Sequence, residues 1–125
     1  MRIFVIDDDK EFADSMAMLM EVWGHEVSVA YSAIDGMVLS RQCEPDVILH
    51  DIAMPNMSGY GAVKQLRTQP RSRPLLIVAV TAHDDVADRN RAQKAGFDAL
   101  MGKPVDLKLL DSMLKAHQAR LAGAC

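Results

Sequence analysis

The sequence lacks the features that mark several large classes of protein. Its two cysteines, Cys43 and Cys125, are too few for a disulfide framework and do not have the spacing of a zinc site. The longest uninterrupted apolar run, Leu75 to Val80, is far shorter than a membrane span. The apolar run Ile3 to Ile6 leads directly into the aspartates at 7–9, which is not the pattern of a signal peptide. We therefore expect a cytoplasmic protein in a reducing compartment, with no membrane contact.

Positive charge is also scarce and is not gathered into a basic run. Lys and Arg number 14 against 17 Asp and Glu, so the formal net charge is −3. A weakly acidic chain of this kind argues against an extended nucleic-acid surface. We expect no direct contact with nucleic acid.

The composition is that of an ordinary globular domain. Apolar residues make up 50% and charged residues 25% of the 125 residues. A chain of this length suits one domain with a sufficient core, and no repeat, linker or low-complexity tract divides it. We expect a single domain over residues 1–125, with a core of about 2–115 and a C-terminal helix and tail to 125.

Short apolar segments have the pattern of strands buried on both faces. These segments are 3–6, 26–30, 47–49, 75–80 and 98–101. Segments with helical spacing of apolar residues separate them and follow the last one. Alternating strands and helices predict an α/β fold, a doubly wound parallel sheet with helices on both faces. Right-handed crossovers then place the carboxyl ends of the strands at one edge, where the functional sites of such sheets lie.

The helical segments carry recognisable boundaries and apolar faces. Asp9 is the expected cap of the first helix, and Ser32 that of the second. The fourth helix is expected to begin at Asp84 or Asp85. The expected core-facing residues are Ile34, Val38 and Leu39 in the second helix, Val63 and Leu66 in the third, and Val105, Leu109, Leu110, Met113 and Leu114 around the last.

The ends of the expected strands carry a small set of chemically related residues. They are Asp7 and Asp8 after the first strand, Asp51 after the third, Thr81 after the fourth and Lys103 after the fifth. Carboxylates held close together repel one another unless a cation compensates, either Mg²⁺ or the lysine ammonium. A carboxylate beside a metal, a lysine and a hydroxyl suits phosphoryl transfer to aspartate.

This ordered set resembles the receiver domain of bacterial two-component response regulators, along the chain from Ile3 to about Leu114. The family's acidic pair matches Asp7-Asp8, and its Thr followed by a small residue matches Thr81-Ala82. Its phospho-accepting Asp, followed by Met-Pro and Gly, matches residues 51–59, and its Lys-Pro matches Lys103-Pro104. The resemblance implies a flavodoxin-like fold of five parallel strands in the order 2-1-3-4-5.

The resemblance also implies a role for each of these residues. Asp51 is the nucleophile that takes a phosphoryl group from the phosphohistidine of a histidine kinase or histidine phosphotransfer protein. Mg²⁺ is the implied cofactor, held by Asp7, Asp8, Asp51 and the backbone carbonyl of Ala53. The expected protein is a signalling phospho-acceptor that assists only its own phosphorylation and dephosphorylation, not an enzyme with a separate substrate.

The remaining implied roles concern the switch. Lys103 contacts the acyl phosphate, and the Thr81 hydroxyl swings toward it while Ala82 keeps the approach open. The Lys103–Pro104 peptide bond is expected to be cis, as in the family. Phosphorylation would then change the binding of a downstream protein, which the sequence does not identify.

The sequence departs from the family pattern at several positions. Ser58 replaces a common Asp, and His50 replaces an apolar or small residue directly before Asp51; we expect a satisfied or partly buried histidine that points away from the Asp51 side. Leu100 stands where many receivers carry Tyr or Phe, so we expect aromatic-switch signalling to be weakened. His83 near the expected site is either an exposed loop residue or an influence on water attack at the acyl phosphate.

Two alternatives to this interpretation remain open from the sequence. Asp7-x-Asp9 after a strand superficially resembles the catalytic pair of a small haloacid-dehalogenase-like phosphatase, but the Asp51 and Met-Pro features would then go unexplained. The other alternative is a receiver-like binding module that is never phosphorylated. We expect no output domain within these residues, and both a stand-alone receiver and part of a larger regulator or hybrid histidine kinase remain possible.

Overall fold

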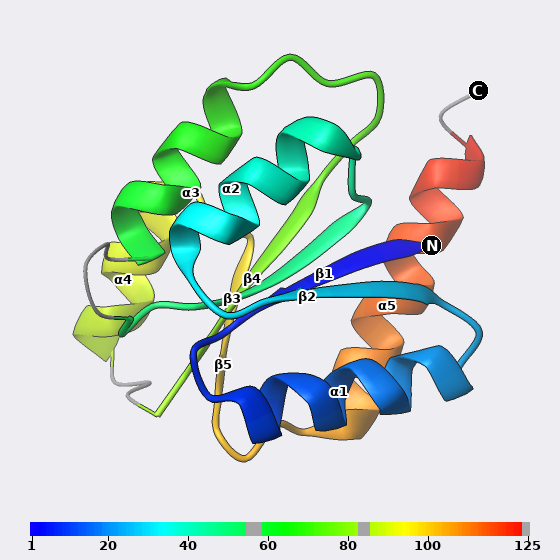
Figure 1. Cartoon of the computed structure of the whole chain (residues 1–125), viewed down its shortest axis with the longest axis horizontal. Coiled ribbons are helices and arrows are strands. Elements are labelled where there is room, and N and C mark those ends of the chain that lie inside the picture. Colours follow the sequence, from blue (N-terminus) through cyan, green and yellow to red (C-terminus); the bar gives the residue numbers. More distant parts are fainter. Residues whose placement is uncertain (55–58, 83–85, 124–125) are drawn as a thin grey trace.

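The computed structural model describes residues 1–54, 59–82 and 86–123 and contains one parallel sheet with helices on both sides (Figure 1). The strands are β1 (Arg2–Ile6), β2 (Glu26–Ala30), β3 (Val47–Asp51), β4 (Leu76–Thr81) and β5 (Ala99–Gly102). The helices are α1 (Lys10–Val22), α2 (Ala33–Gln42), α3 (Gly59–Thr68), α4 (Val86–Ala95) and α5 (Leu107–Gly123). The strand order is β2-β1-β3-β4-β5, which confirms the expected α/β fold and topology.

Each face of the sheet packs against its own set of helices. Helices α1 and α5 cover one face, and α2, α3 and α4 cover the other (Figure 1). Alternate residues of each strand enter the two cores: Leu49 of β3 lies with α1 and α5, whereas Ile48 lies with α2, α3 and α4. Both residues are almost fully buried, as the apolar composition of the central strands predicts.

Both expected helix caps are confirmed. The Asp9 carboxylate accepts a hydrogen bond from the Phe12 N–H at 3.1 Å at the start of α1. The Ser32 hydroxyl accepts one from the Asp35 N–H at 3.1 Å at the start of α2. The cap at Asp9 turns the chain into α1 directly after the acidic pair, so it helps to set the direction of the segment that carries the site.

The expected core face of α2 is partly wrong: Leu39 packs against the core, as expected, but two other residues do not. Ile34 and Val38 are 60% and 45% exposed, and α2 instead buries the small residues Ala33 and Gly36 together with Met37 and Ser40. A Cβ at Gly36 would lie only 2.5 Å from the side chain of Ile6. The small residues therefore let α2 approach the sheet closely, and this turns its larger apolar residues toward solvent.

The expected core face of α5 is also partly wrong. Leu110 and Leu114 are fully buried, as expected, but Leu109 is 50% exposed. The buried side of α5 continues through His117 and Leu121, which lie at helical spacing after Leu114. Val105 precedes the helix and packs against its core from the loop.

Other expectations for helices are confirmed or fall outside the described residues. Val63 and Leu66 of α3 are buried, as expected. The expected start of α4 at Asp84 or Asp85 lies outside the residues that the structure describes, as does Ser58. Within the described part of the chain, none of the helices has the length and apolar composition that crossing a membrane requires.

Candidate functional site

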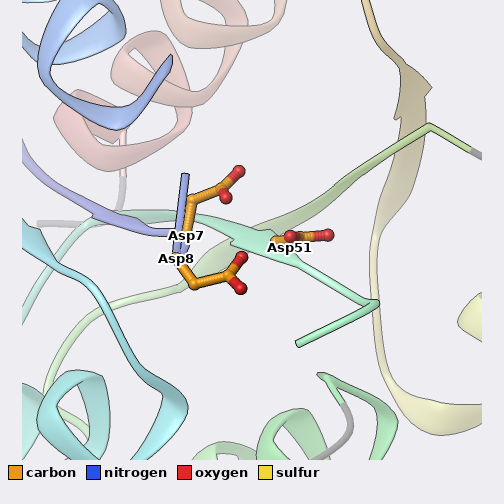
Figure 2. Close-up of side chains that lie close together, drawn as sticks. All are labelled: Asp7, Asp8 and Asp51. Atoms are coloured by element: carbon orange, nitrogen blue, oxygen red, sulfur yellow. The ribbon is translucent and has the colours of Figure 1, made fainter. Parts of the chain in front are cut away.

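The carboxyl ends of the strands bring the expected carboxylates together. Asp7 and Asp8 follow β1, and Asp51 is the last residue of β3. One carboxylate oxygen from each of the three residues lies within 4.8 Å of the others, and Figure 2 shows the three side chains gathered in one place. Asp7 and Asp51 are buried, whereas Asp8 is exposed. The arrangement requires compensating positive charge.

Lys103 supplies part of that charge. Its Nζ lies 2.8 Å from Oδ2 of Asp7, and it also lies 4.3 Å from the centre of the Phe12 ring. The other oxygen of Asp7 accepts the backbone N–H of Asp9 at 2.9 Å. Both carboxylate oxygens of Asp7 are therefore engaged by partners from within the chain, as its 1% exposure requires.

The main chain holds Lys103 and Asp7 in place. The Lys103 N–H donates to the carbonyl of Thr81 at 2.8 Å, and the Asp7 N–H donates to the carbonyl of Ala30 at 3.0 Å. Both bonds continue sheet pairing beyond the ends of the strands. Burial lowers the pKa of Lys103, but the hydrogen bond and charge of Asp7, together with the charges of Asp51 and Asp9, raise it overall, so the ammonium form is favoured.

Asp51 is buried like Asp7 but has no ion-pair partner among the described residues. Burial raises its pKa to about 6, and the negative charge of Asp7 acts in the same direction. A hydrogen bond from the Ala53 N–H to Oδ1, at 3.1 Å, and the charge of Lys103 oppose this increase. An under-compensated carboxylate beside two others is a place where a cation would be stabilised.

The donor set fits a hard divalent cation. The residues at the cluster offer carboxylate oxygens, and the exposed residue Ala53 lies close to Asp51 in the chain. Oxygen-only donors are typical of Mg²⁺, while zinc sites are usually built from nitrogen and sulfur. Asp7, Asp8, Asp51 and the carbonyl of Ala53 are the groups that could hold such an ion, and Asp7 also pairs with Lys103.

Thr81 ends β4 next to this cluster and is 2% exposed. Its carbonyl accepts the Lys103 N–H. This backbone hydrogen bond holds the two residues that carry the expected hydroxyl and ammonium groups side by side. Ala82 is exposed, and the Lys103–Pro104 bond is cis, as expected. His83 lies outside the described residues.

His50 points to the face of the sheet away from α1 and α5, as expected, but it is fully buried and only one of its ring nitrogens has a partner among the described residues. Its Nδ1 lies 2.7 Å from the backbone carbonyl of Asp51, and its ring meets Phe97 edge-on at 6.4 Å. Among the described residues, Nε2 has no hydrogen-bond partner. Burial lowers the pKa of His50, so the neutral ring with a proton on Nδ1 is favoured. The bond to Asp51 could not be foreseen, because strand alternation gives a side chain's direction and not its reach.

Gly59 has a role that only the structure shows. A Cβ at this position would lie 2.7 Å from both the Asp51 carbonyl oxygen and the Ile52 Cα, and the Gly59 N–H donates to the Ile52 carbonyl at 2.9 Å. The start of α3 thus packs directly on the backbone of Asp51 and Ile52. The sequence signal was the glycine itself, in the segment that follows Asp51, but it carried no geometric reason.

The comparisons with known proteins identify the family of this chain. The family model for the response regulator receiver domain matches residues 3–115. The chain belongs to the response regulator receiver domain family. This receiver domain is 34% identical over 122 residues to protein PilH of Pseudomonas aeruginosa, covering 98% of each chain. It is 30% identical to the response regulator MprA of Mycobacterium avium but covers only 50% of that protein.

Solved structures have the same fold as this receiver domain. The Francisella response regulator 1452 receiver domain matches with a TM-score of 0.85 at 26% identity, over 95% of this chain and 97% of that one. A two-component response regulator from Clostridium difficile matches with a TM-score of 0.88 at 24% identity, over 95% and 96% of the two chains. The second likeness concerns the fold alone. The family match thus assigns this chain to the receiver domains of two-component signalling systems.

Proposed function

We propose that this receiver domain accepts a phosphoryl group on Asp51 from the phosphohistidine of a histidine kinase or histidine phosphotransfer protein. The observation that carries the proposal is the cluster of Asp7, Asp8 and Asp51 within 4.8 Å, with Lys103 bonded to Asp7. Asp51 has the raised pKa of about 6, which still leaves it largely ionised at neutral pH. An ionised carboxylate is the form that can attack phosphorus.

In the proposed step, one oxygen of Asp51 forms a bond to phosphorus while the phosphorus–nitrogen bond of the donor phosphohistidine breaks. The electron pair of that bond stays on the imidazole nitrogen, and a proton restores the neutral ring. Mg²⁺, bound by Asp7, Asp8, Asp51 and the Ala53 carbonyl, would neutralise charge on the phosphoryl oxygens. Asp51 bears the new acyl phosphate and returns to the free carboxylate when water cleaves it.

Lys103 and Thr81 would act on the product of this step. The ion pair between Lys103 and Asp7 would weaken, and Lys103 would contact the acyl phosphate, because that group brings new negative charge to the cluster. The Thr81 hydroxyl would donate to a phosphoryl oxygen. These movements are the proposed origin of the switch, which changes the affinity for a downstream protein.

The wider setting is part of the same proposal. We place the protein in the cytoplasm, as a single receiver domain over residues 1–125, either alone or within a larger regulator. It is a phospho-acceptor that assists only its own phosphorylation and dephosphorylation. The phosphatase alternative has less support, because Asp7 would be the nucleophile and its oxygens are held by Lys103 and the Asp9 N–H.

The test is incubation with Mg²⁺ and acetyl phosphate, followed by intact mass spectrometry. We expect a base-labile adduct of one phosphoryl group that requires Mg²⁺ and is absent from Asp51→Asn. An adduct that survives this substitution would mean that another residue is the acceptor. No adduct at all would favour the alternative of a binding module that is never phosphorylated.

A further inference from the structure

A groove of about 360 Å³ between α3 and α4 is distinct from the acidic cluster. Three of the side chains that line it are cations: Lys64 comes from α3, and Arg91 and Lys94 come from α4. Tyr60 and Asn90 are among the uncharged lining residues, and no carboxylate of the described residues lines the groove. Figure 1 shows the two helices that form it on the same side of the sheet.

These cations are available to a ligand. Lys64, Arg91 and Lys94 are exposed, and the ion pairs found within the described part of the chain include none of them. Arg67, at the other end of α3, shows the contrast, because it is paired with Asp98 at 2.6 Å. Three cations without an ion-pair partner among the described residues thus lie in one groove, although the whole chain has a net charge of −3.

The groove has a defined geometry. The guanidinium of Arg91 lies over the ring of Tyr60, with its carbon 4.2 Å from the ring centre. Stacking restrains the guanidinium while its N–H groups stay free to donate to a carboxylate in a two-pronged manner. Lys64 and Lys94 add two further positive charges to the groove, and the Asn90 amide can both donate and accept hydrogen bonds.

We propose that this groove binds an acidic segment of a partner protein, with an affinity that depends on the phosphorylation state of Asp51. A short carboxylate-bearing peptide fits better than nucleic acid, because the groove is small and the chain as a whole is net negative. The charge complementarity is with clustered Asp or Glu side chains. The binding part of the proposal stands apart from the proposed function, whereas the dependence on Asp51 rests on it.

A continuous set of ring contacts joins the groove to Asp51. Tyr60 packs edge-on against Phe97 with ring centres 6.4 Å apart, and Phe97 packs in the same way against His50, also at 6.4 Å. His50 in turn bonds to the Asp51 carbonyl. A shift of the Asp51 backbone on phosphorylation would therefore be passed through these rings to Tyr60, on which Arg91 stacks. This set does not involve position 100, where this chain has no ring.

The binding test uses a fluorescein-labelled peptide of alternating glutamate and glycine, with fluorescence anisotropy as the readout. The groove variant is Lys64→Gln/Arg91→Gln/Lys94→Gln. Its matched control, Arg41→Gln/Lys108→Gln/Arg120→Gln, removes the same charge from exposed positions on α2 and α5. We expect the groove variant to lose about tenfold or more in affinity and the control less than about twofold. Equal losses would overturn the proposal.

A second measurement removes any dependence on the folding of the variants. Amide chemical shifts of the unaltered protein, titrated with the same peptide, should change in α3 and α4 around Lys64, Arg91 and Lys94. Changes confined to other elements would overturn the proposal. A labelled oligothymidine of equal length that bound the same residues more tightly than the peptide would replace the acidic partner by a nucleic acid.

The regulatory part is tested on protein whose phosphorylation has been verified by intact mass. We expect peptide affinity to change by about threefold or more on phosphorylation, and Phe97→Leu to bind peptide and accept phosphate but to lose this change. Unchanged affinity in fully phosphorylated wild-type protein would overturn the dependence on Asp51. Failure to form any adduct would instead refute the proposed function and leave the anisotropy result for the groove intact.

Discussion

Nζ of Lys103 lies 2.8 Å from Oδ2 of Asp7, across 96 residues of sequence. Asp7 is the most deeply buried carboxylate of the acidic cluster, so its negative charge is the one that most needs a partner. The ion pair with Lys103 compensates it. It leaves Asp51 with its raised pKa. Within the cluster, Asp7 is therefore paired with a cation while Asp51 keeps a raised pKa, and this difference has measurable consequences.

Replacement of Lys103 by Gln should destabilise the protein, because it leaves the buried Asp7 carboxylate without its cation. We expect a loss of about 3 kcal/mol in the free energy of unfolding, measured by urea denaturation in EDTA. The matched control is Lys115→Gln, whose i,i+4 pair with Asp111 has a lysine 75% exposed. That change should cost less than about 0.5 kcal/mol. Similar losses in the two variants would contradict a structural role for the pair.

Asp51 should make the protein less stable as the pH rises. Its pKa is higher in the folded protein, about 6 against 3.8, so the folded state holds the proton more tightly. The stabilisation is complete below 3.8 and is lost as the pH rises through 6, by at most about 3 kcal/mol.

The measurement is the difference between wild type and Asp51→Asn, taken by urea denaturation in EDTA across this range. The difference is needed because the lowered pKa values of His25, His50 and His117 change stability in the opposite direction. We expect Asp51→Asn to be the more stable protein at pH 7 and the gap to close toward pH 4. A gap independent of pH would show that Asp51 titrates normally.

Mg²⁺ should raise the melting temperature, since a ligand that binds the folded state stabilises it. The effect should weaken below pH 6 as Asp51 takes up its proton. Asp8→Asn should reduce Mg²⁺ affinity by about tenfold or more. Asp9→Asn is the control, because Asn still caps α1 while removing the same charge. Equal weakening in both variants would argue for diffuse attraction over a defined site.

Gly59→Ala should disturb the backbone next to Asp51. Its Cβ would lie 2.7 Å from the Asp51 carbonyl oxygen, so the backbone of Asp51 or α3 must shift. We expect a loss of about 2 kcal/mol in unfolding free energy and slower phosphorylation by acetyl phosphate. Gly61→Ala on the same helix meets nothing within 4 Å and should be neutral or slightly stabilising. Normal phosphorylation of Gly59→Ala would show that the contact is not needed.

Leu100 should change little in its dynamics on phosphorylation. It is partly buried against the core shared by α2, α3 and α4 and has no ring to turn. Relaxation dispersion on the free and phosphorylated protein is the measurement. We expect similar exchange around Leu100 in both states, with differences near Thr81. Large exchange confined to Leu100 would contradict the hypothesis that aromatic-switch signalling is weakened here.

Sequence patterns predicted those features of the site that follow from the order of strands and helices along the chain. A buried strand followed by polar residues indicates its own carboxyl end, and parallel topology places such ends at one edge. The proximity of Asp7, Asp8 and Asp51 could therefore be expected from the amino-acid sequence. Side-chain pairing within the cluster could not, because it depends on how far α5 and β5 bring Lys103 toward β1.

Periodicity and chain direction were sufficient to predict the order of the elements, the parallel sheet and the set of residues at its functional edge. Tertiary packing decided which of these residues touch. It turned Ile34 and Val38 of α2 to solvent, because small residues on the neighbouring side of the helix allowed a closer approach to the sheet. It also joined Lys64 of α3 with Arg91 of α4 in one groove. Such outcomes depend on the rotation and distance of packed helices, which a local pattern does not encode.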